Sequence, residues 1–333
     1  MVFLVVGDAN ADLSSTLARF PDEGDDVPMT ELGYGSGGSG ANVATALAKL
    51  GARARLVTAV GSDPGAAIAL RAAREAGVDL SFVETHPTVA TGTCVVAISP
   101  SGERTFLSFR GANAVVSCPD FEAVFQDVVH LHVAGHALLE GEQWLTTLAL
   151  MKEATRRDVP LSIDICLPLV RARAEELFAL APRFAVLFGN QSELGELGGF
   201  APNDHGATPC EAAIAALLGA GVPLVVGKLG AEGAVVAEGS TRTLVPPFPA
   251  DVRDTTGAGD GFVGAFLYAW RRGATAEGAG RLGNAAGALV VSRPGAAASL
   301  PGREELSCLL SRHGSELHSS LLANDNPTIG RAT

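Results

Sequence analysis

The chain has 333 residues, of which 47% are hydrophobic and 40 are glycine. This length suffices for one large α/β domain or two small ones, and the glycines suit a buried sheet joined by tight turns. Lysine and arginine number 24 against 36 aspartates and glutamates, so the formal net charge is −12. Because general nucleic-acid and membrane-surface binders depend on basic patches, this charge argues against both classes.

The five cysteines are widely spaced and include no Cys-x-x-Cys pair, which argues against a zinc site and a disulfide framework. The segment from Met1 to Asp8 has no basic region and meets a charge too early for a signal peptide. No apolar run reaches the length that spans a bilayer. We therefore expect a reduced, soluble, cytoplasmic protein.

Short apolar runs alternate with helical patterns along most of the chain. The predicted buried strands are residues 2–6, 55–60, 128–133, 161–165, 185–188 and 224–226, and the predicted helices are residues 41–50, 65–76, 142–156, 175–180 and 210–218. This alternation predicts an α/β fold with a doubly wound, mainly parallel central sheet and helices on both faces. A last helix-to-strand unit is expected over residues 279–300. We expect one domain of residues 1–312, followed by a loose tail of residues 313–333.

Two segments break this rhythm. Residues 13–29 are polar and rich in Asp and Pro, and residues 91–110 alternate around a turn at Pro100-Ser101-Gly102-Glu103, as a hairpin does. We expect both in a small antiparallel sheet that stands off the main layer as a lid, formed by residues of about 11–36 and 88–112.

The stretch from Asp254 to Gly261 alternates glycines with small residues and leads directly into an apolar helix. Glycines let backbone N–H groups approach a ligand, and a helix N-terminus attracts an anion. Asp260 places a carboxylate among these donors, where it would repel a phosphate unless it had a chemical task. The task we infer is to take a proton from a hydroxyl that attacks the phosphate.

A second glycine cluster contains the pattern G-x-G-x-x-G at Gly35, Gly37 and Gly40, with Asp63 at about the distance expected of a dinucleotide-binding site. That fingerprint belongs after the first strand, whereas this cluster follows a polar, poorly periodic segment. We favour a flexible loop whose backbone approaches a polyol, with Asn42 at the next helix start. An NAD-binding Rossmann dehydrogenase remains the alternative.

Three weaker patterns follow strands or lie on them. Asn190 and Glu193 could organise Mg²⁺ or form an ordinary helix cap, and the segment Lys228 to Gly233 could lie along a nucleotide or form a hairpin turn. The three histidines His130, His132 and His136 lack a carboxylate or Cys in ligand spacing, so we assign no metal to them.

Taken in order, these motifs resemble those of the ribokinase-like (PfkB) family of carbohydrate kinases. The matching anchors are Gly7-x-x-Asn10-x-Asp12, Gly37-Gly38-x-x-x-Asn42, Asn190-x-x-Glu193, Asp254 to Asp260, Asn284-Ala285-Ala286 and Arg293-Pro294-Gly295-Ala296 with Ser299. The resemblance covers nearly the whole chain and implies one α/β/α kinase domain with a small β lid over the sugar.

The resemblance also implies roles for individual residues. Asp260 would be the catalytic base, and the N–H groups of Gly257, Ala258 and Gly259 the anion hole. The implied sugar ligands are Asn10, Asp12, Gly38 and Asn42; the implied ATP-site residues are Asn190, Lys228, Gly230, Gly233 and Asn284, with Glu193 placing Mg²⁺ through water; and the implied monovalent-cation (K⁺) residues are Asp254, Thr256, Val290, Arg293, Gly295 and Ser299.

Three departures from the family pattern lie on the acceptor side. Ser39 stands where ribokinases carry Lys, His136 where they place a sugar-contacting Glu, and Cys166 within a segment that is often Asp-Pro-Asn-x-Arg. Arg110 at the lid edge could meet an acidic or phosphorylated substrate, or could be a solvated lid residue. These departures put ribose itself in doubt while leaving the chemistry intact.

The function that we predict is transfer of the γ-phosphoryl group of ATP to a primary hydroxyl of a small sugar, which is ribose-, fructose- or keto-deoxy-sugar-like. A nucleoside kinase is the alternative within the family, with Phe106 and Phe109 as candidates to stack on the base. A non-catalytic sugar sensor and the NAD-dependent dehydrogenase are the other classes. A homodimer through the lid would be typical of the family.

Overall fold

The computed structural model describes residues 1–100, 104–199 and 207–313. Its main layer is a sheet with the strand order β13-β12-β11-β10-β9-β8-β1-β4-β5. The bounds are β1 (Val2–Val6), β4 (Arg53–Gly61), β5 (Val83–His86), β8 (Val128–Ala134), β9 (Leu161–Asp164), β10 (Phe184–Asn190), β11 (Leu224–Lys228), β12 (Ala234–Glu238) and β13 (Thr241–Val245). Neighbouring strands from β5 to β11 are parallel, and β12 and β13 are antiparallel additions at one edge. The prediction of a mainly parallel sheet is confirmed.

Helices cover both faces of this sheet. One face packs against α1 (Ser39–Lys49), α2 (Pro64–Glu75), α8 (Ala258–Trp270), α9 (Ala276–Val291) and α11 (Arg303–Arg312), and the other packs against α3 (Phe121–Val124), α4 (Gly141–Arg156), α5 (Leu167–Leu180), α6 (Gln191–Leu197) and α7 (Ala207–Gly219). Along β1, Phe3 and Val5 join the first core and Leu4 and Val6 the second. A strand buried on both faces needs a continuous apolar sequence, which is why this run was recognisable.

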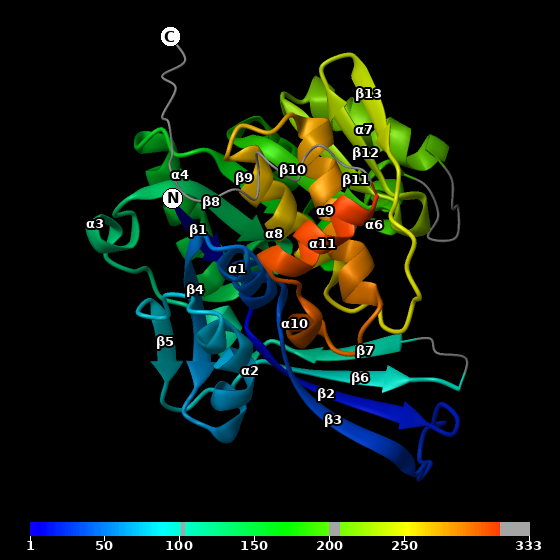
Figure 1. Ribbon diagram of the computed structural model, residues 1–333. Helices are drawn as coiled ribbons and strands as arrows, with labels where there is room; N and C mark the ends of the chain where they lie inside the picture. The colour runs from blue at the N-terminus through cyan, green and yellow to red at the C-terminus, as the bar shows by residue number, and fades with distance from the viewer. Residues whose placement is uncertain (101–103, 200–206, 314–333) are drawn as a thin grey trace.

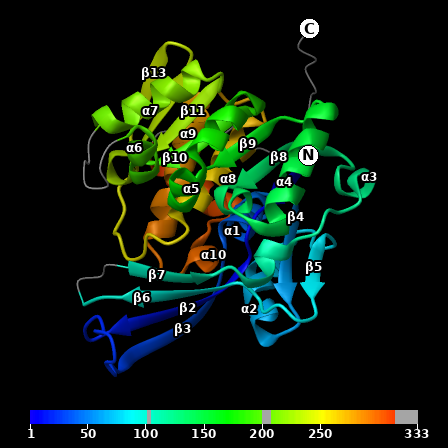
Figure 2. The same ribbon diagram turned by 180° about the vertical axis from the view of Figure 1, so that it is seen from behind.

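The lid is a separate sheet with the order β3-β2-β6-β7 (Figures 1 and 2). Its strands are β2 (Asn10–Leu17), β3 (Met29–Gly37), β6 (Thr93–Ile98) and β7 (Arg104–Phe109). The expectation of a purely antiparallel sheet is wrong, because β2 and β6 pair in parallel. Both strands leave the main sheet at the same edge, β2 after β1 and β6 after β5, and so run in the same direction. Residues 101–103 of the predicted turn lie outside the described residues.

Two further expectations are corrected. Residues 279–300 hold no strand in the described structure: α9 is followed by a short helix, α10 (Ala296–Ser299). The glycine cluster that we interpreted as a flexible loop forms the end of β3, and Gly40 lies in α1. The predicted tail falls on residues 314–333, which are outside the described residues. None of the described helices is long and apolar enough to cross a bilayer.

Four short 3-10 turns complete the described elements. They are η1 (Gly111–Val115), η2 (Gly135–Leu138), η3 (Ala181–Arg183) and η4 (Gly230–Glu232). Of these, η1 follows the lid strand β7 and η2 follows β8, so both lie near the carboxyl edge of the main sheet. This edge is where open α/β sheets bind their ligands.

Candidate active site

Polar side chains gather where neighbouring parallel strands end. Asp8 follows β1, and Asp164, Asn190 and Lys228 are the last residues of β9, β10 and β11. Because these strands are adjacent and parallel, their carboxyl ends share one edge of the sheet. Helix α8 begins above this edge and brings Asp260 to it.

Asp260 is held by two hydrogen bonds from α1. The Ser39 hydroxyl donates to Oδ1 at 2.7 Å, and the Asn42 amide Nδ2 donates to Oδ2 at 2.7 Å. Burial raises the pKa of Asp260 to about 6, although these two donors pull it in the opposite direction. A carboxyl group with this pKa is ionised at neutral pH and can still take up a proton, as a general base must.

The start of α8 has the geometry that an anion requires. Gly257, the N-cap, has φ of 77°, and a Cβ there would lie 3.0 Å from Cα of Ala296. Among the described residues, no atom accepts a hydrogen bond from the backbone N–H of Gly257 or Gly259, whereas Ala258 N–H donates to Thr255 O at 3.2 Å. These unpaired donors and the helix dipole favour a negatively charged ligand.

Lys228 lies directly beside this helix start. A Cβ on Gly259 would be 3.2 Å from Lys228 Nζ, and Nζ donates to Oδ1 and Oδ2 of Asp164 at 2.6 and 2.7 Å. Burial alone would lower the pKa of Lys228, but the carboxylates of Asp164 and Glu193 outweigh burial and raise it. Lys228 is therefore a fixed cation next to the predicted anion hole.

The acceptor side of Asp260 carries polar atoms without partners. Oδ1 of Asp12 and Oδ1 of Asn42 are buried and have no hydrogen-bond partner. Burial and the nearby Asp260 raise the pKa of Asp12 to about 7. Gly38, with φ of 88°, leaves no room for a side chain, since a Cβ would lie 2.4 Å from Asp8 O. Buried acceptors of this kind are satisfied by a ligand that offers hydroxyl groups.

Arg110 and His136 border the same side. Arg110 Nη2 donates to Oδ1 of Asp8 at 2.9 Å and to Gln143 Oε1, so the interpretation of Arg110 as a solvated lid residue is wrong. His136 lies in η2, where burial lowers its pKa and Asp8, Arg110 and Asp164 surround it. A neutral imidazole thus stands where the family pattern has a carboxylate.

The residues expected around ATP lie at the ends of β10 and β11 and on α9. Asn190 and Glu193 form the capping box of α6, with Glu193 N donating to Asn190 Oδ1 at 2.9 Å and Asn190 N to Glu193 Oε2 at 2.7 Å. Gly230 and Gly233 have φ of 60° and 90° in the connection from β11 to β12. The Asn284 amide donates to Val245 O and Pro246 O at 3.0 Å each, and so anchors the chain after β13.

Asp254 connects the two segments that hold the predicted monovalent-cation residues. It accepts hydrogen bonds from Thr256 N and Gly295 N, both at 2.9 Å. Ser299 Oγ donates to Ala296 O at 2.8 Å and to Gly295 O, and Arg293 N donates to Val290 O at 3.1 Å. The lid reaches this loop through Arg104, whose Nη2 lies 3.1 Å from Asp254 Oδ1 and donates to Arg253 O at 3.2 Å.

The remaining histidines belong to the core. His130 Nε2 and His132 Nδ1 both contact Ser162 Oγ, at 2.7 and 2.9 Å, and both rings are fully buried. Burial lowers the pKa of each, so both are neutral. In the described part of the chain, no group of three or more His, Cys, Asp or Glu residues could hold a metal ion.

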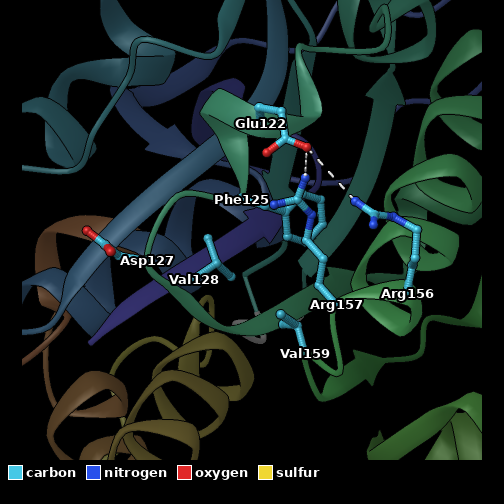
Figure 3. Close-up of a pocket in the computed structure, with 7 residues that line it drawn as sticks. All are labelled: Glu122, Phe125, Asp127, Val128, Arg156, Arg157 and Val159. Carbon is cyan, nitrogen blue, oxygen red and sulfur yellow. Dashed lines mark hydrogen bonds and ion pairs between the residues drawn. The ribbon is translucent and has the colours of Figure 1, made fainter.

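A separate surface depression lies at the opposite edge of the sheet, near the start of β8 (Figure 3). It is lined by Glu122, Phe125, Asp127, Val128, Arg156, Arg157 and Val159. Both arginines are already paired, Arg156 with Glu153 and Arg157 with Glu153 and Glu122. Its two carboxylates are paired as well, Glu122 with Arg157 and Asp127 with Arg53, and we do not assign the reaction to it.

A family model for the pfkB family of carbohydrate kinases matches residues 3–303. The chain belongs to this family. It is 26% identical over 313 residues to the deoxyribokinase of Salmonella typhi, with 93% of this chain and 99% of that protein covered. It is 30% identical over 308 residues to the ATP-dependent ribose-1-phosphate kinase of Halopiger xanaduensis, with 92% and 97% covered.

Solved structures agree with this assignment. The ribokinase of Arabidopsis thaliana, complexed with ribose and ATP, matches with a TM-score of 0.80 and 28% identity over 92% of this chain and 98% of that one. The ribokinase of Thermotoga maritima matches with a TM-score of 0.79 and 27% identity, covering 93% and 99%. The protein is an ATP-dependent carbohydrate kinase with the ribokinase fold. The dinucleotide-binding alternative loses its basis, because Gly35 and Gly37 lie in a strand and Asp63 caps α2.

Two residues of the site were not recognised from the sequence. Asp164, which directly precedes the departing segment at Cys166, was not singled out, and the contact of Ser39 with Asp260 was not predicted. The position of Asp164 at the end of a buried strand was an available signal. Ser39 and Asp260 are 221 positions apart, and no local pattern in the sequence connects them.

Proposed function

We propose that the protein transfers the γ-phosphoryl group of ATP to a primary hydroxyl of a small ribose-, fructose- or keto-deoxy-sugar-like substrate, with Asp260 as the general base. The observation that carries this proposal is the position of Asp260. Its carboxylate is oriented by Ser39 and Asn42 and lies in the first turn of α8, among unpaired backbone donors and beside Lys228. Proton acceptor and anion site are therefore adjacent.

The reaction follows from this arrangement. Asp260 removes the proton of the acceptor hydroxyl as its oxygen attacks the γ-phosphorus, and the bond to the leaving ADP oxygen breaks. The N–H groups of Gly257, Ala258 and Gly259 and the Lys228 ammonium stabilise the negative charge on the transferring group. General-base catalysis of this kind contributes about 10²–10⁴-fold.

ATP and Mg²⁺ are the cofactors that the residues fit. Asn190, Lys228, Gly230, Gly233 and Asn284 would line the nucleotide, and Glu193 would hold Mg²⁺ through water. Burial raises the pKa of Glu193 against the lowering effect of Lys228, so a cation nearby would favour its ionised form. Mg²⁺ prefers oxygen ligands, keeps several waters and neutralises phosphate charge when bound. The solved Arabidopsis relative was determined with ATP.

A monovalent cation such as K⁺ would be bound at Asp254, Thr256, Val290, Arg293, Gly295 and Ser299. Asp254 and Thr256 lie in the loop before α8, and the other four residues lie between the end of α9 and α10. Hydrogen bonds from Gly295 N to Asp254 Oδ2 and from Asp254 N to Val291 O join the two segments, which supports the assignment. A K⁺ ion there would stabilise the loop that presents the anion hole.

Pentoses are the first substrates to test, because the relatives include a deoxyribokinase, a ribose-1-phosphate kinase and ribokinases. The nucleoside alternative finds less support. Phe106 and Phe109 are three positions apart on β7 and therefore point to opposite faces of the lid, so they do not form one shelf.

A homodimer through the lid is the quaternary state that we propose. The lid exposes several large apolar side chains, namely Met29, Leu32, Tyr34, Phe106, Leu107 and Phe109. Burial of such a surface against a second copy would remove it from water. Light scattering at micromolar concentration would give twice the chain mass of 33.9 kDa, and a monomer mass would contradict the proposal.

The test of the function is a phosphorylation screen with Mg-ATP over D-ribose, 2-deoxy-D-ribose, D-fructose, 2-keto-3-deoxygluconate and adenosine. We expect ADP formation that depends on one of the sugars. Absence of sugar-dependent ADP formation from every compound would overturn the proposal, and a preference for adenosine would favour the nucleoside alternative.

A further inference from the structure

Asn113 is fully buried in η1, the turn that follows the lid strand β7. Its side chain makes four hydrogen bonds. Oδ1 accepts from Ala9 N at 2.9 Å and from the Thr58 hydroxyl at 3.0 Å, while Nδ2 donates to Ala9 O at 3.3 Å and to Asn10 Oδ1 at 2.8 Å. An amide has two donor hydrogens and two lone pairs on oxygen, so this network uses its whole capacity.

The network fixes which way both amides face. The backbone N–H of Ala9 can only donate, so the Asn113 atom that it meets is the oxygen. Nδ2 of Asn113 must then face Asn10, and Asn10 must offer its oxygen in return. Asn10 Nδ2 is left as the free end, and no described residue accepts a hydrogen bond from it.

The contact between the two amides is also closely packed. A Cβ on Gly92 would lie 2.1 Å from Asn113 Nδ2 and 2.4 Å from Asn10 Oδ1. Gly92 therefore allows the backbone to close over the pair, and Gly92 O accepts a hydrogen bond from Ala11 N at 2.8 Å. A hydrogen bond enclosed in this way competes little with water and holds its orientation.

We infer that Asn113 is a positioning residue for the acceptor: it locks Asn10 so that only N–H donors face the substrate, which must supply an oxygen acceptor there. Asn113 does not touch the substrate itself. The inference rests on the proposed function, because Asn10 is placed beside the sugar only by that proposal. The proposed acceptor pocket would then present N–H donors from Asn10 at one position. It would present the unpartnered oxygen acceptors of Asp12 and Asn42 at other positions.

The test uses the sugar of the screen that the wild-type protein phosphorylates fastest. For Asn113→Ser we expect the sugar KM to rise about 10-fold, the order expected from losing one oriented hydrogen bond, with kcat and the ATP KM within about 3-fold. Thr58→Val is the matched control. It removes another hydrogen bond to Asn113 and lowers Tm, but Ala9 still orients the amide, so the sugar KM should change less than about 2-fold.

A double-mutant cycle separates positioning from general destabilisation. Asn10→Ala alone should raise the sugar KM, and adding Asn113→Ser to it should change KM by less than about 2-fold, because the two residues act as one unit. The inference would be overturned if Asn113→Ser and Thr58→Val raised the sugar KM equally. It would also be overturned if the effect of Asn113→Ser on KM simply added to that of Asn10→Ala. An unchanged KM in Asn10→Ala, or no sugar-dependent turnover in the wild type, would instead remove the proposed site and the inference with it.

If the serine variant fails to fold, Asn113→Asp is the alternative, because aspartate has nearly the same side-chain shape as asparagine. Its carboxylate would repel Asn10 Oδ1, whereas the protonated acid could donate to it. The ratio of variant to wild-type sugar KM should therefore be larger at pH 8 than at pH 6. A ratio that does not change with pH would contradict the positioning role.

Discussion

The two sides of Asp260 are built differently. On the phosphate side, the donors are backbone N–H groups at the start of α8, and Lys228 is held by both oxygens of Asp164. On the acceptor side, Asp12 and Asn42 keep buried oxygen atoms without partners, and the flanking lid exposes apolar side chains. The phosphate side therefore leaves backbone N–H donors free for an anion, whereas the acceptor side leaves buried side-chain oxygens free for a ligand that offers hydroxyl groups.

This difference indicates that the phosphate side determines the reaction and the acceptor side determines which substrate is used. Backbone geometry at a helix start accommodates the same phosphate whatever the acceptor. Side chains with unsatisfied atoms select the acceptor, because leaving a buried polar atom unpaired costs about 1–3 kcal/mol. The departures at Ser39 and His136 are consistent with this division: Ser39 donates a hydrogen bond to Asp260, and His136 lies beside Asp8 and Arg110.

Asp260→Asn should produce the largest loss, because it removes the proposed base, which lies between the two sides. We expect kcat to fall at least about 100-fold, the lower end of the usual contribution of a general base. Thermal stabilisation by Mg-ATP should persist, since the backbone donors remain. Steady-state kinetics and a thermal-shift assay test both points, and near-normal turnover would contradict the assignment.

Lys228→Met would break the phosphate side without touching the acceptor side. We expect kcat to fall about 100-fold from lost charge stabilisation, the lower end of the loss when one donor of an anion hole is removed. Asp164 and Glu193 would lose their cation, so the free energy of unfolding should fall by about 3–5 kcal/mol, as for a broken buried pair. Denaturant unfolding measures this loss.

Adding Asp164→Asn to Lys228→Met should restore part of the stability but none of the activity. Recovery of activity in the double variant would show that Lys228 serves only to balance Asp164.

Ser39→Ala should shift the pH dependence of activity to higher pH. The Ser39 hydroxyl stabilises the ionised carboxylate, so its removal should raise the pKa of Asp260 above about 6. Activity requires the ionised form, so kcat/KM should rise with pH at a higher pH than in the wild type and reach a similar plateau. Ser36→Ala is the control, because the Ser36 hydroxyl on β3 donates to Ile68 O in α2 and not to Asp260. An unshifted profile would contradict the role of Ser39.

Arg104→Gln should have the smallest effect on the kinetics. This variant tests whether the contact between the lid and the loop at Asp254 affects binding of the sugar. Loss of the Arg104 contact with Asp254 should raise the sugar KM by about 2- to 5-fold, in keeping with a net contribution of about 0.5–1.5 kcal/mol from one hydrogen bond. Arg19→Gln, which removes an exposed ion pair within the lid, should leave KM unchanged. Equal effects of both variants would argue against the coupling.

The strands of the main sheet were predictable to within about two residues where apolar runs were continuous, as in β1 and β8. The parallel pairing of β2 with β6 was not, because it depends on where two distant segments leave the main sheet. The strand expected in the unit of residues 279–300 is absent from the described structure, where α9 continues to Val291 and is followed by the four-residue helix α10, which is too short to show a helical period in the sequence.

The site was predictable where chemistry lies in one local segment, as from Asp254 to Asp260. It was not predictable where residues meet across the fold: Ser39 with Asp260, Arg104 with Asp254, and Asn113 with Asn10. Such contacts depend on the relative placement of helices, lid and sheet, and the sequence pattern around each residue carries no sign of its partner.

The most direct test of the central claim is product analysis by phosphorus NMR after incubation with Mg-ATP and the preferred sugar. The account predicts equal amounts of ADP and a sugar phosphomonoester on a primary carbon for the wild type, and neither in comparable time for Asp260→Asn. ADP with inorganic phosphate but no sugar phosphate, or sugar phosphate formed as fast by Asp260→Asn, would contradict it.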